Sequence, residues 1–196
     1  MELGPVTLDG TIVRLEALRP IHSEGLSKAA QDPAIWTWMS QDLSDYHVLA
    51  RWLQSALDEE QGQRGYAFVV IERATGEALG STRFLNINPI DRGVEIGWTW
   101  YTPRVWGTVV NPEAKWLLMK HAFEAWGALR VELRTDHLNQ HSQAAIRKFG
   151  AIYEGMLRNH RVRRDGSLRH TVVFSVLLSE WPAVSLRLQE RIAQTR

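Results

Sequence analysis

A carboxylate, an arginine–glycine loop and a helix start occur in close succession between Val94 and Glu113. The segment 94–101 has the residues of a strand, and Arg104 and Gly107 follow it just before a helical pattern begins. A helix start offers free backbone N–H groups and the positive end of its dipole, so it binds anions well. Gly107 lets a ligand approach the backbone closely, and Arg104 adds a fixed positive charge. The segment indicates an anion site, with an ordinary strand–helix turn as the alternative.

Glu95 lies inside this strand and is the candidate general base. Burial in a cleft would raise the pKa of its carboxyl group into a useful range, whereas a position facing water would leave it an ordinary surface residue. The alternation of a strand predicts two faces, one formed by Glu95, Gly97, Thr99 and Tyr101 and the other by Ile96, Trp98 and Trp100.

Asn139 and Ser142 form a third candidate group, at the start of a predicted helix over 139–149. An asparagine cap followed by a serine in the first turn is common capping chemistry and needs no function. Ser142 nevertheless falls on the apolar side of this helix, together with Ile146 and Phe149. A hydroxyl group that points inward needs a hydrogen-bond partner, and a ligand could provide it.

The elements that must position these residues predict one mixed α/β domain over 1–196, with a core of about 8–181 and a final helix over about 182–195. We expect a mostly antiparallel sheet flanked by helices, with two long final strands joined by a two-residue turn at Asp165-Gly166. Asn111 and Pro112 are the expected N-cap and first residue of a helix. The other predicted strands are 11–18, 66–72, 78–87, 94–101 and 130–136, and the predicted helices are 22–31, a helix from Ser44 onward, 111–126, 139–149 and 184–193.

The composition excludes several classes of protein. The chain has 196 residues, 44% hydrophobic and 23% charged, which excludes disordered, collagen-like and disulfide-scaffold classes. The absence of cysteine excludes thiolate metal sites and a cysteine nucleophile. We expect a cytoplasmic protein without a membrane span, because no apolar run is long enough and the first residues do not resemble a signal peptide. His137 and His141 lack an evident third ligand, so no metal site is expected.

The net charge of +1 conceals an asymmetry between the two halves of the chain. Residues 1–98 carry a net charge of −6 and residues 99–196 one of +7. We expect no general nucleic-acid binding from a nearly neutral chain, although the basic half could hold one anionic ligand. The arginine-rich stretch 158–170 leaves RNA or an acidic protein segment open as a partner, with a solvated hairpin as the simpler interpretation.

Eight short motifs follow one another from about Leu8 to Trp181: Glu95-Ile-Gly-Trp, Arg104-x-Trp106-Gly107-Thr108, Asn111-x-Glu113-Ala114-Lys115, Asn139-x-x-Ser142, Phe149-Gly150-Ala151, Glu154-Gly155-x-x-Arg158, Asp165-Gly166 and Glu180-Trp181. No single motif is specific. In this order and spacing the set resembles the GNAT N-acetyltransferases, and within them the branch of the ribosomal-protein alanine N-acetyltransferases.

The resemblance implies the acyl-CoA N-acyltransferase fold and transfer of an acetyl group from acetyl-CoA to a primary amine, such as a protein N-terminus or a small amine. It implies that Glu95 takes a proton from the amine through water and that Ser142 donates to the leaving thiolate. Without cysteine, direct attack in a ternary complex is the simplest route. The acidic half would supply Glu95 and much of the acceptor side, and a homodimer is left open.

The resemblance also implies a coenzyme site. The pantetheine arm would contact Asn139 and pair with the splayed backbone at Trp98, Thr99 and Trp100. Trp36 and Trp38 would line the acceptor pocket, with a role as a cap on the core as the alternative. The coenzyme pyrophosphate would be bound, with help from Arg104, by the loop Trp106, Gly107, Thr108, Val109, Val110 and Asn111.

Val109 departs from the family pattern, which has glycine or alanine at that position. A β-branched residue restricts the loop to negative φ and adds bulk beside the ligand. Taken together, the motifs make an N-acetyltransferase the leading hypothesis, and the departure at Val109 keeps alternatives open. The second is a non-catalytic module that binds acyl-CoA or protein with the same fold, and the third is an RNA-associated protein that uses the arginine-rich hairpin.

Overall fold

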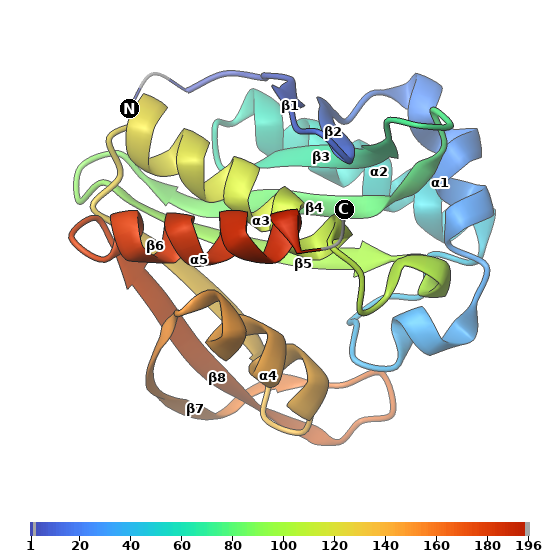
Figure 1. Cartoon of the computed structure of the whole chain (residues 1–196). Coiled ribbons are helices and arrows are strands. Elements are labelled where there is room, and N and C mark those ends of the chain that lie inside the picture. The colour runs from blue at the N-terminus through green and yellow to red at the C-terminus, as the bar shows by residue number, and fades with distance from the viewer. Residues whose placement is uncertain (2, 195–196) are drawn as a thin grey trace.

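An eight-stranded sheet forms the middle layer of the protein (Figure 1). The computed structural model describes residue 1 and residues 3–194. Within them the strand order is β1-β2-β3-β4-β5-β6-β8-β7, and every neighbouring pair is antiparallel except β5 and β6, which are parallel. The strands are β1 (Leu8–Asp9), β2 (Val13–Ala17), β3 (Tyr66–Glu72), β4 (Ala78–Asn88), β5 (Gly93–Tyr101), β6 (Arg130–Asp136), β7 (Ile152–Val162) and β8 (Leu168–Leu177).

Helices cover both faces of the sheet (Figure 1). Helices α3 and α5 lie side by side on one face with α4, and α1 and α2 cover the first half of the sheet on the other face. None of the helices within the described residues combines the length and the apolar character that crossing a membrane requires. The helices are α1 (Ser23–Ala29), α2 (Tyr46–Gln61), α3 (Val110–Lys120), α4 (Gln140–Phe149) and α5 (Trp181–Ala193).

The start of α3 differs from the expectation. The helix begins at Val110 with Val109 as its N-cap, so Asn111 is not the cap and Pro112 is not the first helical residue. Pro112 is tolerated in the first turn because the N–H groups there have no intrahelical acceptor. The loop before the helix is therefore two residues shorter than predicted.

Three further boundaries are corrected. The helix predicted over 111–126 ends at Lys120, and a single π-helical turn, His121–Ala125, completes the segment. The last hairpin is not closed by a two-residue turn at Asp165-Gly166, because residues 163–167 form a longer connection closed by a hydrogen bond from Arg163 N to Ser167 O. The last helix starts at Trp181, and residue 195 of the predicted helix lies outside the described residues.

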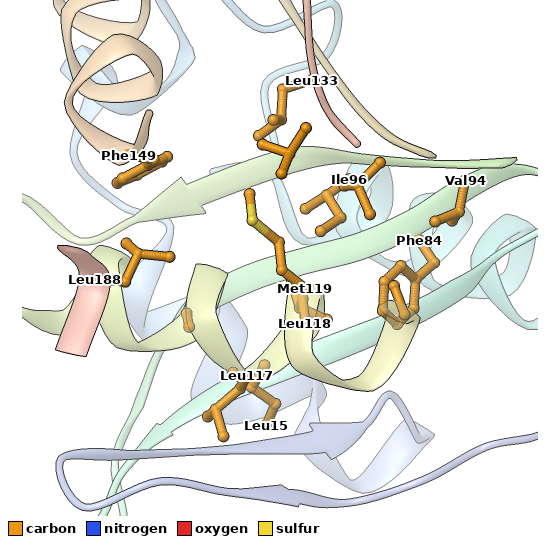
Figure 2. Close-up of a cluster of buried hydrophobic side chains, with 14 of the residues drawn as sticks. Leu15, Phe84, Val94, Ile96, Leu117, Leu118, Met119, Leu133, Phe149 and Leu188 are labelled. Carbon is orange, nitrogen blue, oxygen red and sulfur yellow. The ribbon is translucent and has the colours of Figure 1, made fainter. Parts of the chain in front are cut away.

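The buried side chains form two clusters, one on each face of the sheet. The larger cluster lies under α3, α4 and α5, and Figure 2 shows part of it, including Ile96 of β5, Met119 of α3, Phe149 of α4 and Leu188 of α5. The smaller cluster lies under α1 and α2 and contains Trp36. Each fully buried valine, leucine, isoleucine, phenylalanine or methionine side chain contributes about 1.5–3 kcal/mol to the stability of the fold by its removal from water.

A β-bulge interrupts β5 at Trp98, whose φ is +49°. On one side of the bulge Gly97 pairs with β4, and on the other side Trp100 does, with a shift of register between them. Trp98 and Thr99 therefore lie opposite the single residue Thr82 of β4.

The bulge overturns the predicted alternation of faces along β5. Ile96 packs in the larger cluster, whereas Trp98 and Trp100 pack in the smaller one on the opposite face. Beyond the bulge, Thr99 and Tyr101 face the side of the larger cluster, away from Glu95. The inserted residue, which sequence alternation cannot reveal, reverses the faces of every residue after it.

The pairing of β5 with β6 is short. It joins Gly93–Glu95 to Arg130–Glu132 and ends there, although both strands continue. From Ile96 onward the edge of β5 that faces β6 has no paired strand among the described residues. Backbone groups on such an edge are free to pair with an extended ligand.

Glu113 attaches the first turn of α3 to the hairpin of β1 and β2. Its carboxylate is buried and accepts hydrogen bonds from Thr11 N and Oγ1 at 2.8 and 2.7 Å, from Ile12 N at 2.7 Å and from Val13 N at 2.7 Å. A side chain at Gly10 would collide with this carboxylate, at 2.6 Å. The position of α3 across the sheet therefore depends on one fully satisfied carboxylate.

Glu113→Gln is expected to destabilise the protein by roughly 2–4 kcal/mol, because an amide cannot accept at both of its polar atoms and leaves buried N–H groups unpaired. Urea denaturation measures the change. Glu190→Gln on the exposed side of α5 is the matched control and should change stability by less than about 0.5 kcal/mol. Equal stability of the two variants would contradict this role for Glu113.

Candidate functional site

Glu95 lies at the point where β5 leaves β6. The residue is 8% exposed, and its carboxylate accepts a hydrogen bond from Asn86 Nδ2 at 2.7 Å and lies 3.5 Å from Arg134 Nε. Burial raises the pKa of Glu95 above its ordinary value of 4.5, and the positive charge of Arg134 opposes that shift. The structure thus places Glu95 in a partly enclosed site and not on an open surface, as a general base requires.

The loop before α3 presents free amides. The N–H groups of Gly107, Val109 and Asn111 have no hydrogen-bond acceptor among the described residues. Gly107 has a φ of +75°, and the space above it is open, so a ligand can reach the backbone. These amides lie at the positive end of the α3 dipole, which is the arrangement that binds phosphate groups.

Two side chains of this loop differ from what the sequence suggested. Val109 has φ −77° and ψ −7°, which a β-branched residue adopts without strain, since Gly107 carries the positive φ. Arg104 forms ion pairs with Glu72 at 2.9 Å and Glu77 at 3.0 Å. The charge of Arg104 is therefore already shared with two carboxylates of the β3–β4 hairpin.

The two tryptophans predicted to line an acceptor pocket have different surroundings. Trp36 is fully buried, donates through Nε1 to Ala30 O at 2.9 Å and packs against Trp100 with ring centroids 5.1 Å apart. Trp36 is thus a core residue and not a pocket wall. Trp38 is 37% exposed and lines a cavity, so its role at an acceptor pocket stays a prediction.

The start of α4 confirms the cap but corrects the buried side. Asn139 Oδ1 accepts from Ser142 N at 2.9 Å, so Asn139 is the N-cap. Ser142 is only half-buried, and no partner for its hydroxyl group exists among the described residues. The buried residue of the first turn is Gln143, whose amide donates to His137 O at 2.8 Å.

Lys115 is a buried cation that the sequence analysis did not single out as functional. It extends from α3 to the bulge, where Nζ donates to Thr99 Oγ1 at 2.6 Å and Thr82 Oγ1 at 3.3 Å. Burial lowers the pKa of Lys115 to about 7. A lysine among the apolar residues of a predicted helix was the available signal.

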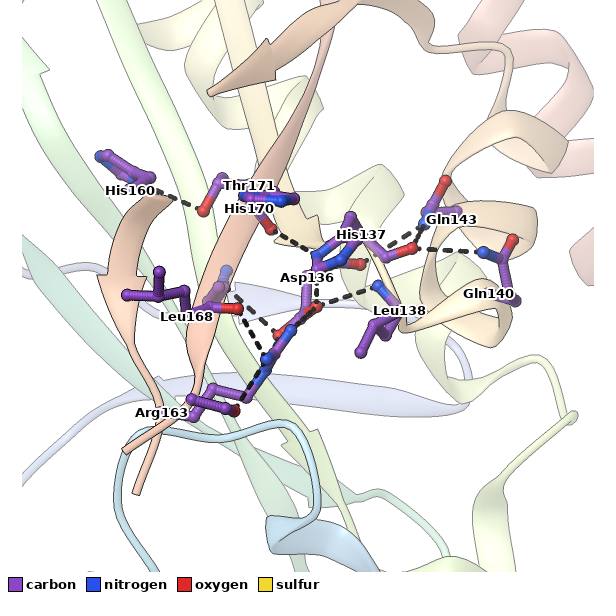
Figure 3. A network of polar contacts seen from close by, with 12 residues as sticks. Asp136, His137, Leu138, Gln140, Gln143, His160, Arg163, Leu168, His170 and Thr171 are labelled. Carbon is purple, nitrogen blue, oxygen red and sulfur yellow. Dashed lines mark hydrogen bonds and ion pairs between the residues drawn. The ribbon is translucent and has the colours of Figure 1, made fainter. Parts of the chain in front are cut away.

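Asp136, at the end of β6, was also missed. It is buried and accepts from Arg163 Nε at 2.7 Å, Arg163 Nη2 at 2.9 Å and Leu138 N at 2.9 Å (Figure 3). Burial opposes the ionisation of Asp136, but the bonds from Arg163 and Leu138 hold its pKa below the ordinary value. This network attaches the β7–β8 hairpin to β6.

No group of three or more metal-ligating side chains gathers within the described ranges, 1 and 3–194.

Comparison with known proteins gives a family for this arrangement. Residues 13–152 match the model of the acetyltransferase (GNAT) domain. No curated protein matches the sequence significantly.

Three solved structures show how far the similarity extends. A GCN5-related N-acetyltransferase from Brucella melitensis is similar over 100% of this chain and 89% of its own, with 29% identity and a TM-score of 0.91. A provisionally assigned acetyltransferase from T. thermophilus is similar over 98% of this chain and 100% of its own, with 33% identity and a TM-score of 0.87. RimJ from Mycobacterium smegmatis, in complex with CoA-disulfide, is similar over 95% of this chain and 92% of its own, with 22% identity and a TM-score of 0.79. At this identity the likeness shows the shared fold alone.

Lys115→Met is expected to reduce the rise of stability with pH. The native state releases the Lys115 proton at about pH 7, whereas the unfolded chain keeps it up to the ordinary pKa of 10.5. Between these values the unfolded state binds more protons, so the free energy of unfolding increases with pH, and the variant lacks this contribution. Urea denaturation across that range measures it. The control, Lys120→Met at an exposed position of α3, should keep the rise, and equal slopes in all three proteins would refute the buried-cation assignment.

Proposed function

Because the chain belongs to the GNAT acetyltransferase family and is an acetyl-CoA-dependent acyltransferase, we propose that it acetylates a primary amine by direct attack in a ternary complex. The observation that carries this proposal is the placement of buried Glu95 directly before the free edge of β5. A base and a backbone edge able to hold an extended thioester thus meet at one point of the strand.

The residues present fit acetyl-CoA. The free amides of Gly107, Val109 and Asn111 suit a pyrophosphate, and the open edge of β5 at Trp98–Trp100 suits the amide groups of the pantetheine arm. Bound there, the thioester supplies the acetyl group. Arg104 is a weaker candidate, because a phosphate would have to compete with Glu72 and Glu77 for it.

Glu95 is the proposed base. An amine is protonated near neutral pH and must lose a proton before its nitrogen can attack a carbonyl carbon. The raised pKa of Glu95 moves it closer to the operating range, and Asn86 and Arg134 hold the carboxylate in place. Through water, the ammonium group first passes one proton to Glu95, which frees the nitrogen for attack. As the new C–N bond forms and the C–S bond breaks, the second proton leaves the nitrogen and the departing thiolate takes up a proton, so that the products are the amide, the free thiol and protonated Glu95.

Ser142 is the proposed donor to the departing sulfur. Its hydroxyl group is half-buried at the start of α4 and is free of any partner within residues 3–194. The cap that Asn139 makes to Ser142 N fixes the backbone there, which keeps the hydroxyl group near one position. A hydrogen bond from the serine stabilises the thiolate as negative charge develops on it.

The acceptor is proposed to be a protein N-terminus or a small amine. The basis for the first option is the set of sequence motifs that resembles the ribosomal-protein branch of the family. A non-catalytic module is the second candidate function, and the unstrained backbone of Val109 removes one reason for it. The bulk of the Val109 side chain remains as a reason for the binding module, and a measurement of coenzyme binding tests it.

A cytosolic setting, which the cysteine-free composition fits, is part of the proposal.

Glu95→Gln is expected to lower kcat by about 10²–10⁴ while leaving the rise in melting temperature caused by acetyl-CoA unchanged. Release of free thiol measures turnover with a panel of peptides and small amines. In the wild type, activity should fall as the pH drops through a value above 4.5, because burial raises the pKa of the base.

Asp91→Asn, in the exposed turn that leads into β5, is the matched control for the loss of a negative charge outside the site and should keep turnover within about tenfold. Full activity of Glu95→Gln would refute the base. A wild type that acetyl-CoA does not stabilise would refute the whole proposal, and one that is stabilised but acetylates no amine would favour the binding module.

A further inference from the structure

A cavity of about 160 Å³ lies between the segment 37–40, which contains Trp38, and the end of the β7–β8 hairpin. Four arginines line it: Arg161, Arg163, Arg164 and Arg169. A volume of this size would hold about five water molecules in the liquid, or one carboxylate or phosphate group with its nearest waters.

Two of the four arginines already have partners within the protein. Arg163 is bonded to Asp136 through two nitrogens and to Leu168 O at 2.8 Å. Arg164 pairs with Asp42 at 3.1 Å and donates to Trp36 O at 3.1 Å. These two residues line the cavity with part of their hydrogen-bonding capacity already in use.

Arg161 and Arg169 are different. They are direct partners across β7 and β8, and neither has a hydrogen-bond acceptor among the described residues. The side chain of Arg169 is only 18% exposed, and its Nε is buried without a partner. The nearest carboxylate oxygen, Asp136 Oδ2, is 3.9 Å away and is already bonded to Arg163.

This arrangement is unfavourable in the absence of a ligand. Like charges directly opposite each other on paired strands repel, and a buried guanidinium nitrogen without a partner is costly. Asp165 also lines the cavity, but its carboxylate accepts from Ser167 N and Oγ and compensates neither arginine. An anion between Arg161 and Arg169 would satisfy both, and guanidinium groups bind carboxylate and phosphate well.

The cavity lies on the same face of the sheet as Glu95. Along β6, Val131 and Leu133 face the larger core cluster, so the alternate residues Arg134 and Asp136 face the other side. Arg134 approaches Glu95 there, and Asp136 contacts the hairpin arginines. Burial raises the pKa of Glu95, and the positive charge of Arg161 is among those that oppose this rise. Arg169 and Glu95 also attract each other electrostatically.

We propose that Arg161 and Arg169 form an anion subsite for the acetyl acceptor, so that the acceptor is a primary amine that also carries a carboxylate or a phosphate. The amine lies toward Glu95, and the anionic group enters the cavity beside Trp38. This inference rests on the proposed function for the identity of the ligand. The anion site itself rests only on the geometry of the cavity.

The first measurement is independent of catalysis. Inorganic phosphate is titrated against the melting temperature at constant ionic strength, with chloride as the balancing anion. The apparent Kd for phosphate should rise at least tenfold in Arg161→Gln and in Arg169→Gln. Arg158→Gln, an exposed arginine on the same strand but outside the cavity, is the matched control and should bind as the wild type does.

Each other result of this titration overturns the site. No stabilisation of the wild type, or a stabilisation that survives both cavity variants, would mean that phosphate binds elsewhere, for example before α3. Equal weakening by Arg158→Gln would mean that the arginines form a diffuse basic surface, of the kind that binds RNA.

The second measurement uses acceptor pairs that differ only in the anionic group: β-alanine with its amide, and aminoethyl phosphate with ethanolamine. The anionic member should have a kcat/KM at least tenfold higher, through KM, and Arg161→Gln should bring the ratio close to one. The pair that responds distinguishes carboxylate from phosphate.

Equal rates for charged and neutral members would refute the inference and leave the acetyltransferase proposal standing. If no amine at all is acetylated, the proposed function fails, and the phosphate titration still decides the anion site.

Discussion

One inserted residue in β5 determines how the rest of the site is arranged. The bulge at Trp98 sends Trp98 and Trp100 into the cluster under α1 and α2 and turns Thr99 toward α3. Glu95, just before the bulge, keeps its position on the charged face of the sheet. The same strand therefore carries a buried carboxylate, a free backbone edge and anchors in both cores, which a regular strand could not combine.

Two charged residues of α3 hold this arrangement in place from one side. Glu113 fixes the first turn of the helix to β1 and β2, and Lys115, two residues later, reaches Thr99 in the bulge. The free amides before α3 are thus held at a fixed position relative to the edge of β5. Four hydrogen bonds offset the cost of burying the charge of Glu113, whereas burial lowers the pKa of Lys115 to about 7, so its two threonine partners offset that cost only in part.

Local patterns were enough to predict most elements, including β3 and β6 at their observed bounds, and the cap at Asn139. They failed where the outcome depends on other parts of the chain. The side of the sheet that Trp36 joins is set by packing against Trp100, and the register of β5 is set by β4. Gln143 takes the buried position in place of Ser142 because carbonyl groups of the turn before α4 accept from it.

The charge asymmetry of the sequence has a different meaning in three dimensions. The acidic half was expected to supply Glu95 and much of the acceptor side. Around Glu95 the two halves meet: Asn86 and the segment 37–40 come from the acidic half, and Arg134, Arg161 and Arg169 come from the basic half. Burial raises the pKa of the Glu95 carboxyl group, and the positive charges of Arg134 and Arg161 oppose that rise. The same cations repel a purely cationic acceptor. An amine that brings its own negative charge avoids that repulsion and leaves Glu95 able to accept its proton.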